Sequence, residues 1–189
     1  MQINFKKQNK GFTIIEVLVA LAIFSLSVVI VMVTLSSGIS NINTVSKKIT
    51  ATYLAQEGLE AVRNVRDDYM LFPANGAGWS DFLTNVYQRC NTNGCGVNDL
   101  IGIPFSSKIE TCGNISCHIF EHSIANGGGY GVDLGGDTST VFNRVITATT
   151  NGADEVIVKS SVSWLEGGVP HIVSFTEELF NWYTIQPAV

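Results

Sequence analysis

A long apolar run near the N-terminus is the strongest pattern in the chain. Phe12 to Leu35 contains no Pro and no Gly, and its one charged residue is Glu16. A helix of roughly 20 apolar residues is long enough to cross the hydrocarbon core of a bilayer. The run therefore predicts a membrane-spanning helix.

The pattern turns polar at Ser36–Asn41 and then resumes with helical spacing. Gly38 lowers helix propensity by about 1 kcal/mol relative to Ala, so we expect the helix to soften there. Beyond it, apolar residues form one broad helical face, made of Val45, Ile49, Ala51, Leu54, Ala55, Gly58, Leu59, Ala61, Val62 and Val65. The opposite face is expected to be an ordinary solvated surface, and it carries Lys47, Lys48, Gln56, Glu57, Glu60, Arg63 and Asp67. One helix from Phe12 to about Asp68 would be ~85 Å long, and half of it would project from the rest of the chain.

Helical periodicity is lost from Leu71 onward, where Gly, Asn, Ser and Thr become frequent. We therefore expect a head that begins with loops. Near the C-terminus, Glu155–Leu165 alternates apolar and polar residues, Glu166-Gly167-Gly168 forms a turn, and Val169–Leu179 is a second strand. This pattern predicts a β-hairpin.

A further strand is expected at Phe142–Thr149, with Val145 and Ile146 available to the core, and the tail from Leu179 to Tyr183 could close over it. The fold class is therefore α+β: a long N-terminal helix, membrane-spanning in its first half, followed by an antiparallel β-sheet head with a variable, loop-rich insertion. The expected division is a basic leader at 1–11, a membrane segment at 12–35, an amphipathic helix at 36–70 and a β-rich head at 71–189.

The charge pattern gives an orientation and excludes one class of partner. Lys6, Lys7 and Lys10 precede the apolar run, which places the N-terminus in the cytoplasm and sends the rest of the chain outward. The formal net charge is -5, and removing these lysines makes the product more acidic. Such a product repels phosphates, so no nucleic acid is expected as a partner.

Two simpler interpretations of the run account for it less well. Cleavage of a secretory signal after Ala20-Leu21-Ala22 would leave the apolar stretch Ile23–Leu35 on the mature N-terminus. A plain signal anchor explains the length and the lysines but leaves Glu16 unexplained. A carboxylate at the centre of a spanning helix costs roughly 2.5–3.5 kcal/mol and less near the interface, so it usually has a partner. Phe12 lies about one helical turn, ~6 Å, from Glu16, so an amine created by a cut between Gly11 and Phe12 would lie at nearly the same depth.

The segment from Lys10 to Phe24, KGFTIIEVLVALAIF, resembles the processing signature of type IV pilins and pseudopilins. It combines a basic leader, a Gly, an aromatic residue, a Glu at fixed spacing and an uninterrupted apolar helix. Ile14 is a mild departure from that signature. Residues 51–63 and 142–183 are also similar to minor pilins of the pilus-modification class.

The resemblance implies a role for three residues. Gly11 would precede the bond cut by a prepilin peptidase, and Phe12 would become the N-methylated first residue. Glu16 would pair with the N-terminal amine of a neighbouring subunit during assembly.

Four cysteines lie in two close pairs, Cys90 with Cys95 and Cys112 with Cys117. Export to an oxidising compartment favours disulfides, and sequence alone allows three connectivities. We expect the local pairs, because each pair brackets a turn that contains a Gly. The alternative is a zinc site made of these cysteines with His118 and His122, although structural zinc usually takes more closely spaced pairs.

No pattern in the head predicts catalysis or a cofactor. The segment Gly127–Asp137 lacks the spacing of a dinucleotide site, and Asp133 and Asp137 fall short of a calcium loop. We expect a flexible surface loop there, and ordinary strand or loop roles for His118 and His122. No metal, cofactor or catalytic residue is expected.

The sequence thus favours a structural subunit, a minor pilin or pseudopilin. Its partners would be prepilin peptidase, other pilin subunits, an inner-membrane assembly platform and the lipid bilayer. It would be a single-pass inner-membrane protein with an exported head before it enters a filament. Two alternatives stay open, a type II secretion pseudopilin and a membrane-anchored envelope binding protein or enzyme.

Overall fold

One long helix and one antiparallel sheet dominate the structure, a computed structural model that describes residues 11–73, 78–98, 108–113, 117–122, 128–131 and 137–182. Helix α1 spans Ile14–Leu71 and continues through Gly38, where the sequence predicted softening. Residues 1–45 and 46–189 form separate compact units. Most of the predicted leader lies outside the described residues; Gly11 is its one described member.

A helical segment follows α1 where the sequence pattern predicted no helix. It consists of α2 (Gly78–Phe82), the π-helical turn η1 (Leu83–Tyr87) and α3 (Gln88–Cys90). The expectation of loops after Leu71 was therefore wrong for residues 78–90. The helices are too short to show an apolar period clearly, but Trp79, Phe82 and Val86 are all buried, and that burial stabilises them.

Within the described ranges, seven strands form one antiparallel sheet, which confirms the α+β class. They are β1 (Cys95–Val97), β2 (Ile109–Thr111), β3 (His118–Glu121), β4 (Tyr130–Gly131), β5 (Thr138–Thr150), β6 (Glu155–Glu166) and β7 (Val169–Phe180). One edge of β5 pairs with β6, which pairs with β7. The other edge pairs with β1 and β3, which pair in turn with β2 and β4.

The hairpin β6–β7 matches its prediction. Glu166 pairs with Val169, and the intervening Gly167 and Gly168 have φ values of 57° and 81°. Positive φ at both central residues defines a type I′ turn, whose twist suits the flanking strands. The apolar alternation of β6 buries Val156, Val158, Val162 and Trp164.

In β5, only one of the two residues assigned to the core lies there. Ile146 is fully buried, whereas the neighbouring Val145 is only half-buried. Successive side chains of a strand point to opposite faces, so both cannot enter the same core. The C-terminal tail also differs from its prediction, because Leu179 is buried but Phe180 and Trp182 are about half exposed; Tyr183 lies outside the described residues.

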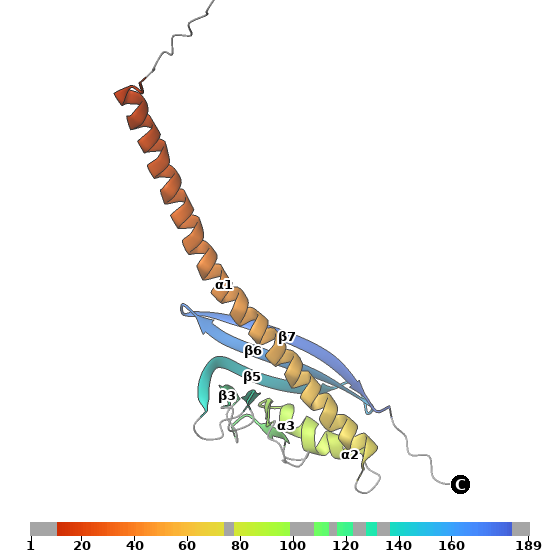
Figure 1. Cartoon of the computed structure of the whole chain (residues 1–189). Helices are drawn as coiled ribbons and strands as arrows, with labels where there is room; N and C mark the ends of the chain where they lie inside the picture. The colour runs from red at the N-terminus through yellow and green to blue at the C-terminus, as the bar shows by residue number, and fades with distance from the viewer. Residues whose placement is uncertain are drawn as a thin grey trace, which may run out of the picture. The chain divides into compact units, whose positions relative to one another are not determined.

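The core lies between the C-terminal half of α1 and one face of the sheet, as Figure 1 shows for α1 crossing β5–β7. The buried hydrophobic side chains of α1 are those of Ala51, Leu54, Ala55, Leu59, Val62, Val65 and Met70. Each fully buried Leu, Val or Met side chain contributes roughly 1.5–3 kcal/mol. Val45 and Ile49, predicted on the same face, are 54% and 51% exposed.

Gly58 marks the closest approach of helix and sheet. A Cβ built at Gly58 would lie 2.7 Å from Ser160 Oγ and 3.1 Å from Arg144 Cδ. Any side chain therefore has to displace sheet residues that are themselves buried. Gly is less favourable than Ala in a helix by about 1 kcal/mol. At this position the absence of a side chain is what allows the helix to pack so closely on the sheet.

We expect Gly58→Leu to destabilise the folded head by about 1–3 kcal/mol, because it overpacks the interface between α1 and the sheet. Urea unfolding of the detergent-solubilised chain, followed by tryptophan fluorescence, measures the change. Gly38→Leu is the matched control, because a Cβ at Gly38 meets nothing within 4 Å. Equal unfolding midpoints for the two variants would contradict the close approach.

Candidate assembly segment and its attachment to the sheet

The residues before α1 leave the predicted cleavage position accessible. Gly11, Phe12 and Thr13 precede the helix and are exposed. The Glu16 amide donates to Thr13 O at 3.1 Å, and it also lies 3.4 Å from Thr13 Oγ1. Thr13 thus caps the first turn, as Thr often does. The peptide bond between Gly11 and Phe12 lies in exposed, non-helical chain, where peptidases cut most readily.

Glu16 lies in the first turn of α1 and is exposed. The positive end of the helix dipole favours a carboxylate there. Its neighbours along the helix are apolar, and no cation from the described part of the chain pairs with it. In an apolar environment, such a carboxylate needs a cation from elsewhere.

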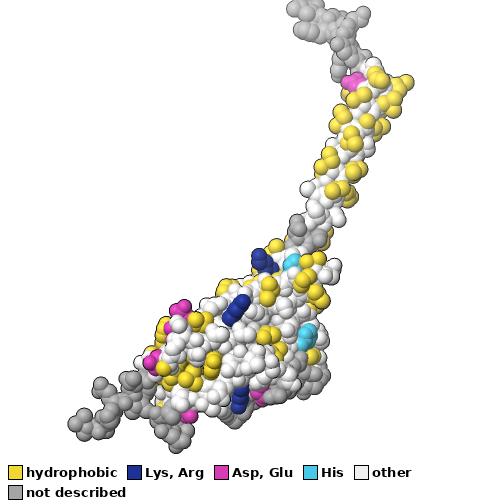
Figure 2. All heavy atoms as spheres, turned by 180° about the vertical axis from the view of Figure 1, so that it is seen from behind, with side chains coloured by type: hydrophobic (Ala, Val, Ile, Leu, Met, Phe, Trp, Pro, Cys, Tyr) yellow, Lys and Arg dark blue, Asp and Glu magenta, His cyan; other side chains and the backbone are white. Residues whose placement is uncertain are grey.

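The N-terminal part of α1 presents apolar side chains outward. Its most apolar stretch has a mean hydropathy of 2.9, and none of that stretch is buried; Figure 2 shows hydrophobic side chains along this segment. The hydroxyls of Ser25 and Ser27 donate to Ala22 O and Ile23 O at 2.9 and 2.8 Å, so these polar groups are satisfied within the helix. Within the described ranges, α1 alone is long and apolar enough to cross a membrane.

In the second unit, a buried cation joins α1 to the centre of the sheet. Arg144 lies on β5 and is only 3% exposed. Its Nη1 donates to Leu54 O at 3.1 Å and to Glu57 Oε2 at 3.1 Å. A buried charge is tolerated when it is paired and hydrogen-bonded. Arg144 therefore fixes where this part of α1 lies on the sheet.

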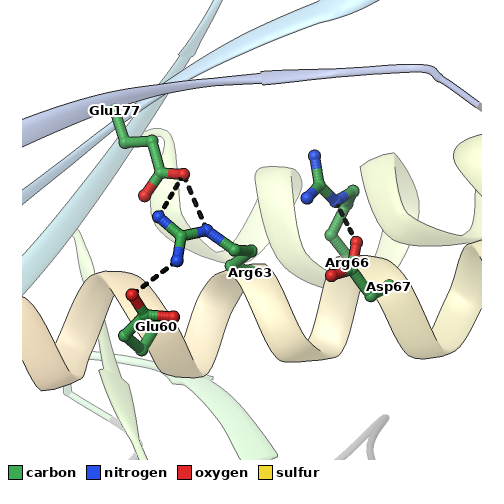
Figure 3. Close-up of polar contacts among 5 residues, drawn as sticks. All are labelled: Glu60, Arg63, Arg66, Asp67 and Glu177. Carbon is green, nitrogen blue, oxygen red and sulfur yellow. Dashed lines mark hydrogen bonds and ion pairs between the residues drawn. The ribbon is translucent and has the colours of Figure 1, made fainter.

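A second polar contact lies one to two turns along α1. Arg63 donates through Nε and Nη2 to Glu177 Oε1 on β7, at 2.8 and 2.6 Å, and through Nη1 to Glu60 (Figure 3). The hydrogen bonds to Glu177 raise the pKa of Arg63 above its ordinary value; desolvation opposes that rise and Glu60 adds to it. Lys47 likewise pairs with Glu166 at 3.0 Å.

These contacts correct the interpretation of the charged side of α1 as only a solvated surface. Glu57, Arg63 and Lys47 all pair with residues of the sheet. The sequence did contain a signal for the first contact, because Arg144 interrupts the apolar alternation of β5. The partner on another element could not be identified without the tertiary structure.

The cysteines form the local pairs. One disulfide joins Cys90, at the end of α3, to Cys95, at the start of β1. The other joins Cys112 to Cys117, on either side of the segment between β2 and β3. No free cysteine remains. The alternative zinc site therefore lacks the thiolates that it would need.

His118 and His122 have specific partners in the structure. His122 Nδ1 lies 2.8 Å from Asp137 Oδ2, and the Asp137 side chain is 0% exposed. His118 Nε2 lies 2.8 Å from Ser139 Oγ. The expected flexible surface loop is thus wrong for Asp137 and for Tyr130–Gly131, which forms β4; Asp133 lies outside the described residues. Over the described ranges, no three His, Cys, Asp or Glu residues gather in a metal-binding group.

Comparisons with known proteins identify the N-terminal segment. A family model described as the prokaryotic N-terminal methylation motif matches residues 6–32. No curated protein and no solved structure matches the chain. The match covers the lysines of the leader, the Gly11–Phe12 bond, Glu16 and much of the exposed apolar helix.

We expect Arg144 and Glu57 to be energetically coupled. Glu57→Gln removes the carboxylate that pairs with the buried guanidinium of Arg144, so it should lower the free energy of unfolding by about 1–2 kcal/mol. Arg144→Met should lower it by a similar amount. The loss of unfolding free energy in the double variant should be smaller than the sum of the two single losses, and the difference of about 1 kcal/mol is the coupling free energy. Urea unfolding of the four proteins measures the coupling.

The pair Lys47–Glu166 is the control for that cycle, because its cation is 36% exposed whereas Arg144 is 3% exposed. Lys47→Gln and Glu166→Gln should show a coupling below about 0.5 kcal/mol. Strict additivity at Arg144 and Glu57 would show that the two side chains do not stabilise the helix–sheet contact together.

Proposed function

We propose that this chain, which carries the prepilin-type signal of type IV pilins, is a minor pilin or pseudopilin that joins, primes or caps a filament assembled from the inner membrane. The observation that carries the proposal is the continuity of the methylation motif with an exposed apolar helix that holds Glu16 in its first turn. A chain with that arrangement is a structural subunit. The head serves it as a folded, non-catalytic body outside the membrane.

In this proposal, the chain matures in a fixed order. Prepilin peptidase removes residues 1–11 on the cytoplasmic side, and Phe12 becomes the N-methylated first residue. Residues 12–35 hold the subunit in the bilayer, residues 36–70 continue the helix outward, and residues 71–189 form the exported head. An assembly platform in the inner membrane then transfers the subunit to a filament of other pilins.

Glu16 supplies the polar contact of assembly. Cleavage creates an amine at Phe12, and Glu16 of one subunit pairs with the amine of its neighbour. Because both groups lie among apolar side chains, each would be costly to bury alone. The contact therefore favours a single register between neighbouring helices.

The rival functions differ in their need for that contact. A type II secretion pseudopilin shares the same chemistry, and its gene neighbourhood distinguishes it. A binding protein or enzyme held in the envelope by α1 would need only a membrane anchor. Removing the Glu16 charge separates that tethered protein from a filament subunit.

We expect prepilin peptidase to cut the chain between Gly11 and Phe12, because that bond lies in exposed chain ahead of α1. Intact-mass spectrometry after co-expression should show loss of Met1 to Gly11. Gly11→Leu should block the cut without changing the fold of the head, since no atom lies within 4 Å of a Cβ at Gly11. A mature chain that begins at Ile23, or full-length chain beside active peptidase, would contradict the maturation step.

We expect Glu16→Gln to reduce incorporation into sheared filaments at least about tenfold, because the neighbouring amine loses its counter-charge in an apolar environment. Quantitative immunoblotting of filament and membrane fractions measures incorporation, and intact mass verifies that the variant is still processed. Ser27→Ala is the control, since its hydroxyl bonds only within the helix. Unchanged incorporation of the processed Glu16→Gln variant would support the tethered-protein alternative.

A further inference from the structure

Among the strands that the structure describes, β7 pairs along only one of its two edges. It pairs with β6 from Val169 to Phe180, and no other described strand lies against it. In an antiparallel sheet, alternate residues of an edge strand direct their N–H and C=O groups away from the neighbour. Such an edge is ready to receive another strand.

The middle of this edge lacks the features that usually protect one. Pro170 lies near one end, and Glu177 and Glu178 lie near the other. Between them, the stretch Ile172–Thr176 has no charge and no Pro, and every residue in it is at least partly exposed. Proline and charge are the common protections of an edge strand, so the unprotected stretch is suited to strand pairing.

A groove of about 740 Å³ runs beside this edge, between β7 and α1. Tyr53, Gln56, Glu60 and Arg63 line it from the helix, and Phe175 and Glu177 line it from the strand. Tyr53 is 68% exposed and Phe175 is partly buried, so the groove offers aromatic surface to one face of an added strand. A volume of this size is within the range of natural binding clefts.

The charge of the groove favours a basic occupant. Glu57 lines it but is already paired with Arg144. The acidity open to a ligand therefore comes from Glu60 and Glu177, and Arg63 is the one cation among the lining residues. That cation already donates to both Glu60 and Glu177. The Glu60 side chain remains 56% exposed, and a Lys or Arg could therefore reach it.

We propose that this groove is a strand-addition site for an extended, basic segment of a partner polypeptide. The segment pairs its backbone with the free edge of β7, packs alternate apolar side chains on Phe175 and Tyr53, and places a Lys or Arg beside Glu60 and Glu177. Backbone pairing supplies affinity, and the alternate side chains supply specificity. A second copy of this chain is a poorer occupant, because it brings the same acidic groove to the interface.

The test uses the full-length chain in detergent micelles and a synthetic peptide of about ten residues, the length of a typical strand. The peptide alternates Val with Thr and carries two Lys residues on its Val face; the matched peptide carries Glu instead. At saturating Lys peptide, we expect the free-edge amides of β7 to exchange with deuterium at least about tenfold more slowly. The amides that face β6 should be unchanged, and the Glu peptide should have no effect.

Two variants with the same change of charge test the groove itself. Glu60→Lys should weaken binding of the Lys peptide about fivefold, since it removes an attraction and adds a repulsion at an exposed site. Glu178→Lys should change the affinity for the Lys peptide less than about twofold, because Glu178 lies on β7 but outside the lining of the groove. Equal effects of the two variants would overturn the groove as the binding site.

Three other results would also overturn the proposal. The β7 amides could exchange at the same rate with and without the Lys peptide, which means that the edge accepts no such strand. They could be protected in the free chain at every concentration, which means that another segment of this chain covers the edge. They could become protected as protein concentration rises, which means that a second copy is the occupant.

Discussion

The close packing of α1 on the sheet is the contact on which the folded head depends. At Gly58 the helix backbone comes near enough to the sheet that one added carbon would lie 2.7 Å from Ser160 Oγ. Ala55 and Ala51, about one and two turns earlier, are also small and fully buried. Small residues allow the larger side chains of β5 and β6 to fill the space beneath the helix. Arg144 adds a polar contact at the same place, because it hydrogen-bonds both a backbone carbonyl and a carboxylate of α1.

Helix α1 meets two different environments along its length. Its N-terminal part exposes apolar side chains, whereas residues 51–70 bury most of theirs in the core of the head. Soluble monomers rarely expose an apolar surface of this size, so we expect a bilayer or other subunits to cover the exposed part. The buried part is satisfied by the sheet of the same chain. One continuous element can therefore belong to a folded head and still offer an apolar surface for assembly.

Covalent and polar links support the part of the head with the least regular structure. Strands β1 to β4 have two to four residues each, and such short strands contribute few ladder hydrogen bonds. Cys90–Cys95 holds β1 against α3, and Cys112–Cys117 closes the chain between β2 and β3. His122 and Asp137 link the end of β3 to the residue before β5. These links limit how far the short strands can separate from the long ones.

The features that depend on local pattern could be predicted from the sequence alone. The apolar run predicted α1, alternation and the two glycines predicted β6–β7, and the motif around Gly11, Phe12 and Glu16 predicted the segment that the family model matches. Each of these signals lies within a few residues of the structure it specifies. Period, turn residues and motif spacing are all local properties.

Only the tertiary structure decided which distant residues meet. It buried Ile146 rather than Val145, paired Arg144 with Glu57, and placed Asp137 against His122. Helices α2 and α3 were missed because a segment of one or two turns carries too little periodicity, and it folds only when packing buries Trp79 and Phe82. The free edge of β7 could not be predicted from the sequence either, because the position of a strand at a sheet edge depends on which strands are its neighbours. Strand order and the partners of buried charges depend on contacts between residues far apart in the chain, and a single sequence does not encode them in any local pattern.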